Sequence, residues 1–198
     1  GALITPGSDL TLMNIGINKT RIALLEVLKE MGADIKLSNV SSEYEPCADI
    51  YIRASELKGI TLNPKLVPNL IDELPVLFIA ASLAEGQTII RGAEELREKE
   101  SDRLEAMSNS LKLLGVKFKI YDDGIDIQGL NQEVHTSNSG MPFEASHINS
   151  FGDHRIAMTS AIACTRANDK SYIEDTKNVT TSFPNFLEIC EEVGLDIK

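Results

Sequence analysis

The sequence predicts an α/β fold that is turned inside out, with helices buried in the centre and sheets forming the outer wall. Three observations lead to this prediction. A pattern of helix, glycine and strand repeats along the chain, a second helical pattern repeats in the same register, and that second helix is strongly apolar. A chain of 198 residues is also long enough to bury a substantial core.

The first repeated pattern is an amphipathic helix followed by a glycine and a strand. It occupies residues 21–35, 102–118 and 182–197. In each segment apolar residues recur at helical spacing, and alternating apolar residues after the glycine predict a strand. Each helix is expected to end where glycine can adopt the left-handed conformation, at Gly32, Gly115 and Gly194. A unit of about 80 residues therefore repeats.

The second repeated pattern is an apolar helix rich in Ala and Ser. Residues 72–82 and 153–163 both begin with Asp and continue in this way. A helix that is apolar on all sides has to be buried on all sides, whereas a doubly wound sheet has amphipathic helices and apolar strands. Short strands are expected at residues 50–53, 87–91, 125–128 and 170–175. Each unit thus contains a strand, an amphipathic helix, two strands and a buried helix.

Composition excludes several classes of function. With 30 acidic and 19 basic residues the formal charge is −11, which argues against a general nucleic-acid binder but leaves room for a small anion at a local basic cluster. The longest apolar run, residues 74–84, is too short to span a bilayer, so no membrane contact is expected. The widely spaced Cys47, Cys164 and Cys190 indicate free thiols and a reducing, cytoplasmic location.

The longest polar stretch, residues 131–149, is interpreted as a surface loop. His135 and His147 lie in it, and we expect both to be exposed to solvent. No His, Cys or Asp cluster in the sequence has the spacing of metal ligands, so neither a metal nor another cofactor is expected.

Two arginines occupy unusual positions. Arg103 and Arg155 each fall in the first turn of a predicted helix, where the helix dipole disfavours a cation. Because helix N-termini with convergent Arg or Lys bind phosphate and carboxylate, the two arginines suggest an anion held between them, and Lys99 adds a third cation. The alternative is a salt-bridge network, which also clusters charge. That network would use Glu98, Glu100 and Asp102.

The polar residues at the helix starts also have an ordinary structural explanation. Asp72 precedes an apolar helix and is either its cap or a base, and Glu73 fits the helix dipole equally well. Ser101 or Asp102 can cap the helix that follows them. His154 is either a helix-start residue or a ligand to a substrate. The sequence leaves these alternatives open.

At these positions the chain resembles a known family. Residues 99–103 (KESDR), 153–158 (DHRIAM) and 181–184 (TSFP), with 67–75 as a fourth block, are similar to the signature of the 5-enolpyruvylshikimate-3-phosphate synthases. The resemblance runs over essentially all of the chain but covers only the C-terminal part of the family's length. It implies that family's fold, which has two domains, each an inside-out α/β barrel of three βαβαββ units.

The resemblance also implies how the chain is organised. Residues 1–198 are expected to form a single domain, the C-terminal domain portion of a two-domain enolpyruvyl transferase, with roughly two and a half repeat units. The missing N-terminal domain of the same protein is then the expected partner. The fragment alone is expected to be inactive, and an exposed apolar groove or strand edge left by the missing part of its first unit invites self-association.

The activity implied by the resemblance is a transferase reaction of the shikimate pathway, which leads to chorismate and the aromatic amino acids. The enolpyruvyl group passes from phosphoenolpyruvate to the 5-hydroxyl of shikimate 3-phosphate, phosphate is released, and no metal or organic cofactor takes part. At matching positions, Asp72 would accept the proton of the 5-hydroxyl. Glu100 would deliver a proton to the methylene of phosphoenolpyruvate and later remove one. Lys99 would contact shikimate 3-phosphate, and Arg103 and Arg155 would hold phosphoenolpyruvate.

One position departs from the family pattern. Many relatives have a Lys where this chain has Thr181, so Thr181 receives no ligand role and sensitivity to glyphosate stays open. Two other functions compete with the one above. The UDP-N-acetylglucosamine enolpyruvyl transferases are similar in fold and reaction but lack the KESDR and DHRIAM blocks, and a non-catalytic module could use the same arginines to bind phosphorylated metabolites. Fusion to another enzyme of the aromatic pathway is a further alternative.

Overall fold

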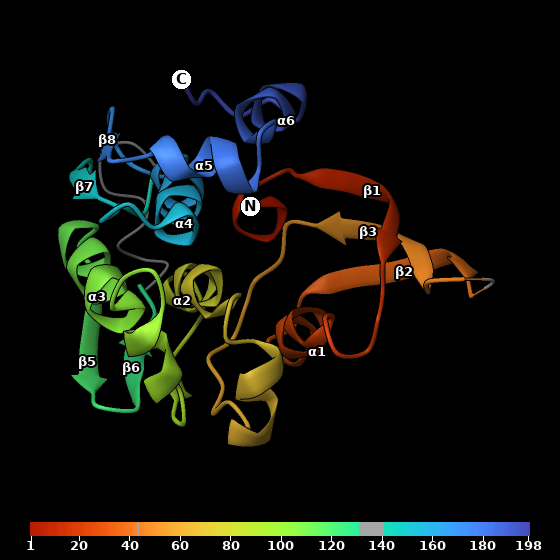
Figure 1. The fold of residues 1–198 in the computed structure, drawn as a ribbon, viewed down its shortest axis with the longest axis horizontal. Helices are drawn as coiled ribbons and strands as arrows, with labels where there is room; N and C mark the ends of the chain where they lie inside the picture. Colours follow the sequence, from red (N-terminus) through yellow and green to blue (C-terminus); the bar gives the residue numbers. More distant parts are fainter. Residues whose placement is uncertain (43, 131–140) are drawn as a thin grey trace.

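The computed structural model describes residues 1–42, 44–130 and 141–198. Three helices pack against one another in the interior and the strands lie outside them (Figure 1). These helices are α2 (Leu74–Ser82), α3 (Arg103–Leu113) and α4 (His154–Cys164). The predicted α/β fold with buried helices is therefore confirmed.

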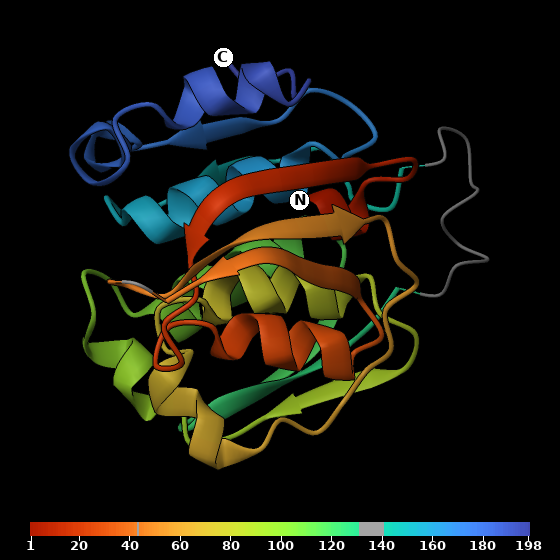
Figure 2. The same cartoon turned by 90° about the vertical axis from the view of Figure 1, so that its right-hand side faces the viewer.

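The strands form three sheets. The first is antiparallel and contains, in spatial order, β1 (Asp9–Gly16), β3 (Cys47–Arg53) and β2 (Asp34–Ser41). The second is also antiparallel, with β4 (Gln87–Ile90), β6 (Gly124–Gln128) and β5 (Lys117–Tyr121). The third pairs β7 (His147–Asn149) in parallel with β8 (Tyr172–Glu174). In Figure 2 the first sheet lies in front, with helix α1 (Ala23–Glu30) beside it and the other helices behind.

The repeated glycines end helices as predicted. Gly32, Gly115 and Gly194 have φ values of 97°, 81° and 84° and follow α1, α3 and α6 (Phe186–Glu192). After the first two glycines the chain continues into β2 and β5. The prediction of a strand after Gly194 is wrong. Leu195 and Ile197 instead pack against a small apolar cluster, and they form no ladder with another of the described strands.

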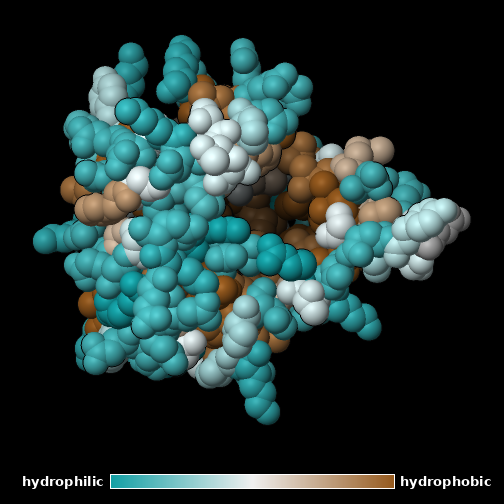
Figure 3. All heavy atoms as spheres, viewed as in Figure 1, coloured by the Kyte–Doolittle hydropathy of each residue, from teal (hydrophilic) through white to brown (hydrophobic). Residues whose placement is uncertain are grey.

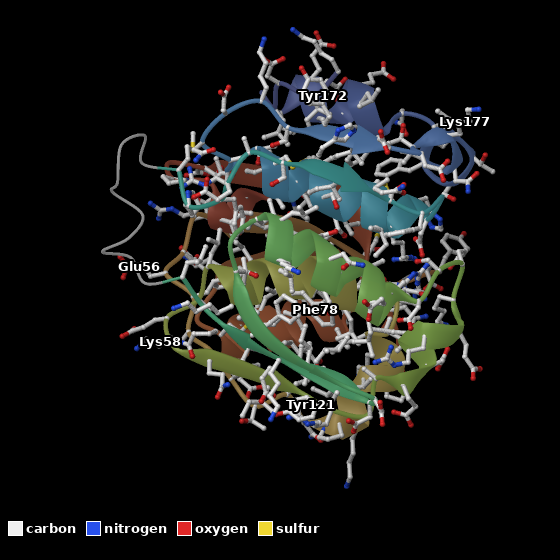
Figure 4. The ribbon with its side chains drawn as sticks, turned by 90° about the vertical axis from the view of Figure 1, so that its left-hand side faces the viewer. Glu56, Lys58, Phe78, Tyr121, Tyr172 and Lys177 are labelled. Carbon is white, nitrogen blue, oxygen red and sulfur yellow. The ribbon has the colours of Figure 1, made fainter. Side chains whose placement is uncertain are left out.

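Helix α2 is the most deeply buried element. Its Leu74, Leu77, Phe78 and Ile79 are at most 1% exposed, as expected for a helix that is apolar on all sides. Figure 4 shows Phe78 in the middle of the molecule, whereas Tyr121 and Tyr172 lie near its edges. Burying such side chains stabilises the fold by about 1.5–3 kcal/mol each, so α2 anchors the elements packed around it.

The polar stretch at 131–149 is only partly what the sequence suggested. Residues 131–140, and His135 with them, lie outside the described residues. His147 is exposed as predicted, but the surface-loop interpretation is wrong for the C-terminal part of the stretch. Phe143 and Ile148 are each 1% exposed, and Ile148 belongs to β7. A strand of three residues is too short to show a periodic pattern, and its burial depends on pairing with the distant β8.

One further α-helix and three short 3₁₀ helices complete the described elements. Helix α5 (Lys177–Ser182) packs against α4, and short 3₁₀ helices occupy η1 (Ala2–Ile4), η2 (Pro64–Asn69) and η3 (Glu94–Glu98). Strand β1 was missed by the sequence analysis because its residues are mostly exposed and a bulge interrupts its pairing with β3. Within the described ranges, no helix is both long and apolar enough to cross a bilayer.

The molecule also exposes apolar surface. A groove of about 850 Å³ runs between α4, β8, α5 and α6 and extends to Thr5 near the first strand. Ala161, Phe186 and Leu195 are among the side chains that line it. Figure 3 shows a second feature, a hollow with apolar walls between the helices and the sheet of β1, β3 and β2.

Candidate functional site

The N-terminal ends of α2, α3 and α4 meet at one place, and the polar residues of the site come from these ends. Asp102 caps α3 by accepting a hydrogen bond from the Glu105 N–H at 2.9 Å. Asp153 caps α4 by accepting from the Arg155 and Ile156 N–H groups at 2.9 and 3.4 Å. Both caps follow from the preference for Asp at this position.

Asp72 does not cap α2. The residue at the cap position is Glu73, and it makes no side-chain bond to the helix backbone. The carboxylate of Asp72 instead faces the two arginines that were singled out in the sequence. The cap interpretation of Asp72 is therefore wrong, because a charged partner outside its own helix takes the carboxylate.

Arg103 is surrounded by carboxylates. Its side chain is 1% exposed, and its Nε atom donates to Asp153 Oδ2 at 2.8 Å. Its two terminal nitrogens donate to Asp72 Oδ1 at 3.0 Å and to Glu100 Oε2 at 2.5 Å. The cation that opposes the dipole of α3 is thus held by three negative charges, which explains its position in the first turn.

Arg155 reaches the same place from α4. Its Nη1 atom donates to the Asp72 backbone carbonyl at 2.9 Å, and its guanidinium lies 3.6 Å from the Asp72 carboxylate and 3.5 Å from that of Glu73. Arg155 is 28% exposed and Asp72 is 31% exposed, so this side of the cluster opens to solvent. Arg103 and Arg155 therefore converge on Asp72, as their positions in the sequence suggested.

The cluster carries more negative than positive charge. It joins two arginines to four carboxylates, those of Asp72, Glu73, Glu100 and Asp153. The salt-bridge network expected as the alternative is therefore present in part. Arg103 pairs with Glu100 but with neither Glu98 nor Asp102. An anion approaching this cluster meets net negative charge unless a carboxylate moves away or further cations are added.

The structure also gives the surroundings of three other residues from the sequence analysis. Lys99 pairs with Glu95, and its charge also acts on Asp72. His154 occupies the first position of α4 and is half-buried. Thr181 is exposed on α5, and that helix is tied to the start of α4 because Asn178 donates a hydrogen bond to the Gly152 carbonyl.

The pKa values of two carboxylates in the cluster, Asp72 and Asp153, lie below their ordinary value. Burial alone would raise the pKa of Asp72, but the charge of Arg155 and the hydrogen bond and charge of Arg103 hold that pKa below its ordinary value. In the same way burial opposes ionisation of Asp153, yet Arg103 lowers the pKa of that carboxyl. Burial also opposes the charge of Arg103, but Asp153 and Glu100 raise its pKa overall. Asp72, Asp153 and Arg103 are therefore ionised at neutral pH.

Sequence reasoning treated Asp153 and Ser101 only as residues at helix starts. In the structure Asp153 is completely buried, and its Oδ2 accepts hydrogen bonds from both Arg103 and Ser101. The signal that could have found Asp153 is its register, since it occupies the same place before its apolar helix as Asp72 does in the preceding unit. Within the part of the chain that the structure describes, no group of three or more His, Cys, Asp or Glu side chains is arranged to hold a metal ion.

Comparison with known proteins gives a consistent result. Residues 1–190 match the family model described as EPSP synthase (3-phosphoshikimate 1-carboxyvinyltransferase). The chain is 47% identical to the 3-phosphoshikimate 1-carboxyvinyltransferase of Methylococcus capsulatus and 45% identical to that of Coxiella burnetii, in each case over all of this chain and 43% of the relative. It superposes on the EPSP synthase of Acinetobacter baumannii with a TM-score of 0.92 at 44% identity, over all of this chain and 44% of that structure. The chain thus spans less than half the length of the curated relatives it matches.

Proposed function

The chain belongs to the EPSP synthase family, and from this we propose that it supplies one wall of a site for enolpyruvyl transfer. The donor is phosphoenolpyruvate, the acceptor is the 5-hydroxyl of shikimate 3-phosphate, and phosphate is the second product. The observation that carries the proposal is the convergence of Asp72, Glu100, Arg103 and Arg155 at the ends of three buried helices. The proposal places the chain in the shikimate pathway, which supplies chorismate and the aromatic amino acids.

Two of the carboxylates act on protons in this proposal. Glu100 gives a proton to the methylene carbon of phosphoenolpyruvate, which makes the adjacent carbon electrophilic. The 5-hydroxyl oxygen then bonds to that carbon while Asp72 accepts the hydroxyl proton. In the second half of the reaction the bond between that carbon and the phosphate oxygen breaks, and the proton accepted by Asp72 passes to the departing phosphate. Glu100 takes back a proton from the methyl group, which restores the double bond. Asp72 is ionised at neutral pH, so its carboxylate can accept the hydroxyl proton.

The cations hold the donor and the acceptor. Arg103 and Arg155 bind phosphoenolpyruvate and Lys99 contacts shikimate 3-phosphate, after their present partners have moved. Glu100 is 53% exposed and Asp72 31% exposed, which supports the idea that an incoming anion displaces their side chains from the arginines. The Arg103 side chain is only 1% exposed, so it becomes available to the substrate only through such a movement.

The net negative charge of the cluster supports a second part of the proposal. Binding of two anionic substrates here needs further cations, and we place these on the remaining part of the protein, a partner N-terminal domain that faces this one. Residues 1–198 then form a single domain portion with two and a half repeats, and this fragment alone does not turn over substrate. The free thiols of Cys47, Cys164 and Cys190 support a reducing compartment, and we propose the cytoplasm.

A chimaera tests the proposed reaction. This chain replaces the matching part of the Methylococcus capsulatus relative, to which it is 47% identical. With phosphoenolpyruvate and shikimate 3-phosphate, we expect stoichiometric phosphate and an enolpyruvyl ether detectable by proton NMR. Product formed with UDP-N-acetylglucosamine as acceptor would favour the related transferase instead. Binding of both substrates without release of phosphate would favour a non-catalytic module.

The isolated chain is also proposed to self-associate. The apolar groove between α4, α5 and α6 supports this, since Leu187 and Phe183, which line it, are 49% and 37% exposed. Light scattering of the 198-residue chain should give a mass above 21.7 kDa that falls on dilution. A mass of one chain at every concentration would overturn this part of the proposal.

A further inference from the structure

The two carboxylate oxygens of Asp153 have different main partners. Its Oδ1 atom accepts hydrogen bonds from the Arg155 and Ile156 backbone N–H groups and so caps α4, and it also accepts a longer hydrogen bond from Arg103 Nη2 at 3.5 Å. Its Oδ2 atom accepts from Arg103 Nε at 2.8 Å and from the Ser101 hydroxyl at 3.1 Å. The Asp153 side chain thus caps α4 mainly through Oδ1, and it binds Arg103 and Ser101 at the start of α3 mainly through Oδ2.

Capping alone does not require a carboxylate. Asn and Ser cap helices about as well as Asp does, and both avoid the cost of burying a charge. Asp153 is 0% exposed, so its charge has to be offset by a partner within the protein. Arg103 is that partner, and the side chain is therefore suited to a second task beyond the cap.

The second task concerns the direction of the Arg103 guanidinium. This group is a planar fork, so fixing Nε and the plane fixes where its two terminal nitrogens point. With Nε on Asp153, the terminal nitrogens meet Asp72 at 3.0 Å and Glu100 at 2.5 Å. The placement of Asp72 and Glu100 relative to each other thus depends on a residue that touches neither of them.

We propose that Asp153 is a positioning residue for enolpyruvyl transfer, because it fixes the direction of the Arg103 guanidinium. That group holds Asp72 and Glu100 before the substrates bind, and it faces phosphoenolpyruvate once the substrate has displaced them. The inference rests on the proposed function of this site and adds a residue to it. Asp153 contacts neither substrate in this account, because its side chain is completely buried. Ser101 assists by donating the second hydrogen bond to Oδ2.

The chain offers a matched control in Asp102. This residue also caps a helix with one oxygen, accepting from the Glu105 N–H at 2.9 Å, and pairs with an arginine through the other, Arg97 at 2.8 Å. It is 38% exposed, and its arginine partner touches neither Asp72 nor Glu100. Asp102→Asn therefore imitates the chemical change in Asp153→Asn at a helix start outside the cluster.

The first experiment compares Asp153→Asn and Asp102→Asn in the chimaera with the Methylococcus capsulatus relative. Asn keeps the helix cap in both variants. We expect Asp153→Asn to lower kcat by about 10²-fold, the effect of a misplaced reacting group, and to change KM for the substrates less. Asp102→Asn should keep kcat within about threefold at a similar melting temperature. Retention of kcat by Asp153→Asn, or an equal loss in both variants, would overturn the proposal.

A second measurement does not depend on activity. Proton exchange of the Arg103 Nε–H, followed by NMR in the 198-residue chain, should be slower than that of the 54% exposed Arg53. Asp153→Asn should accelerate it and Asp102→Asn should not. If the unsubstituted chimaera releases no phosphate, the proposed function fails, while slow exchange would still show that Asp153 holds Arg103. Exchange at Arg103 as fast as at Arg53 would overturn the positioning role even if Asp153→Asn does not fold.

Discussion

Arg103 and Asp153 form a buried ion pair with an Nε–Oδ2 distance of 2.8 Å, and neither side chain is more than 1% exposed. The pair joins the first turn of α3 to the cap of α4, which lie far apart in the sequence. A buried pair of this kind is held by its geometry and its additional hydrogen bonds, and loss of one partner leaves a charge without compensation.

Removal of the arginine should therefore destabilise the fold. Arg103→Met leaves Asp153 buried without its counter-charge, and we expect the free energy of unfolding to fall by about 3–5 kcal/mol in urea denaturation. Arg53→Met is the control, because its contacts with Asp9 and Asp34 are long and exposed and should be worth about 1 kcal/mol or less. Equal losses in the two variants would contradict a structural role for the buried pair.

Glu100 should be needed for turnover but not for folding. In the chimaera, Glu100→Gln is expected to lower kcat by about 10²–10⁴-fold, as for loss of a positioned acid or base, while the melting temperature stays close to that of the parent. The control is Glu98→Gln, which changes an exposed carboxylate two residues earlier. Turnover within a few-fold of the parent would remove Glu100 from the proposed mechanism.

Stability should decrease in acid because of Asp153. Its pKa is lower in the folded chain than its ordinary value of 3.8, so ionisation favours the folded state. This contribution is fully present above the ordinary value and is lost as the pH falls through the folded-state pKa. The free energy of unfolding, measured by urea denaturation from neutral pH to below pH 4, should fall more steeply in the parent than in Asp153→Asn. If the free energy of unfolding of the parent and of Asp153→Asn fell in parallel with pH, this would contradict the lowered pKa of Asp153.

The interior around α2 should tolerate truncation poorly. Phe78 is 0% exposed, and Phe78→Ala is expected to lower the free energy of unfolding by about 3–5 kcal/mol because it leaves a cavity. Leu113→Ala, on the surface of α3 and 46% exposed, should cost far less. Denaturant titration of both variants measures the difference. A comparable loss at both positions would mean that α2 is not the anchor of this core.

Much of the fold could be predicted from the sequence because its signals are local. Helical spacing and glycines at helix ends correctly placed α1 and α3, and the apolar runs correctly marked α2 and α4 as buried. The failures concern pairing between distant segments. The segment after Gly194 pairs with none of the described strands, although it packs near Ile173 of β8. Strand β7 forms only through its pairing with the distant β8, and β1 has too few buried residues to show a pattern.

The convergence of Arg103 and Arg155 could be predicted from the sequence, but the contacts that they make could not. The unusual first-turn position of Arg103 and Arg155 correctly indicated that the two side chains converge. It did not reveal that Asp72 faces them rather than capping α2, nor that Asp153 is buried against Arg103. Those contacts join segments that are far apart in the chain, so no local pattern in a single sequence encodes them.

The most direct test of the central claim is phosphate release from phosphoenolpyruvate and shikimate 3-phosphate by two proteins at equal concentration. One is the 198-residue chain alone, and the other is the same chain within the remaining part of the Methylococcus capsulatus relative. If this chain is one wall of the site, only the second protein releases phosphate, because the cluster of Asp72 and its partners cannot bind two anions by itself. Equal turnover by the isolated chain, or none by either protein, would contradict that claim.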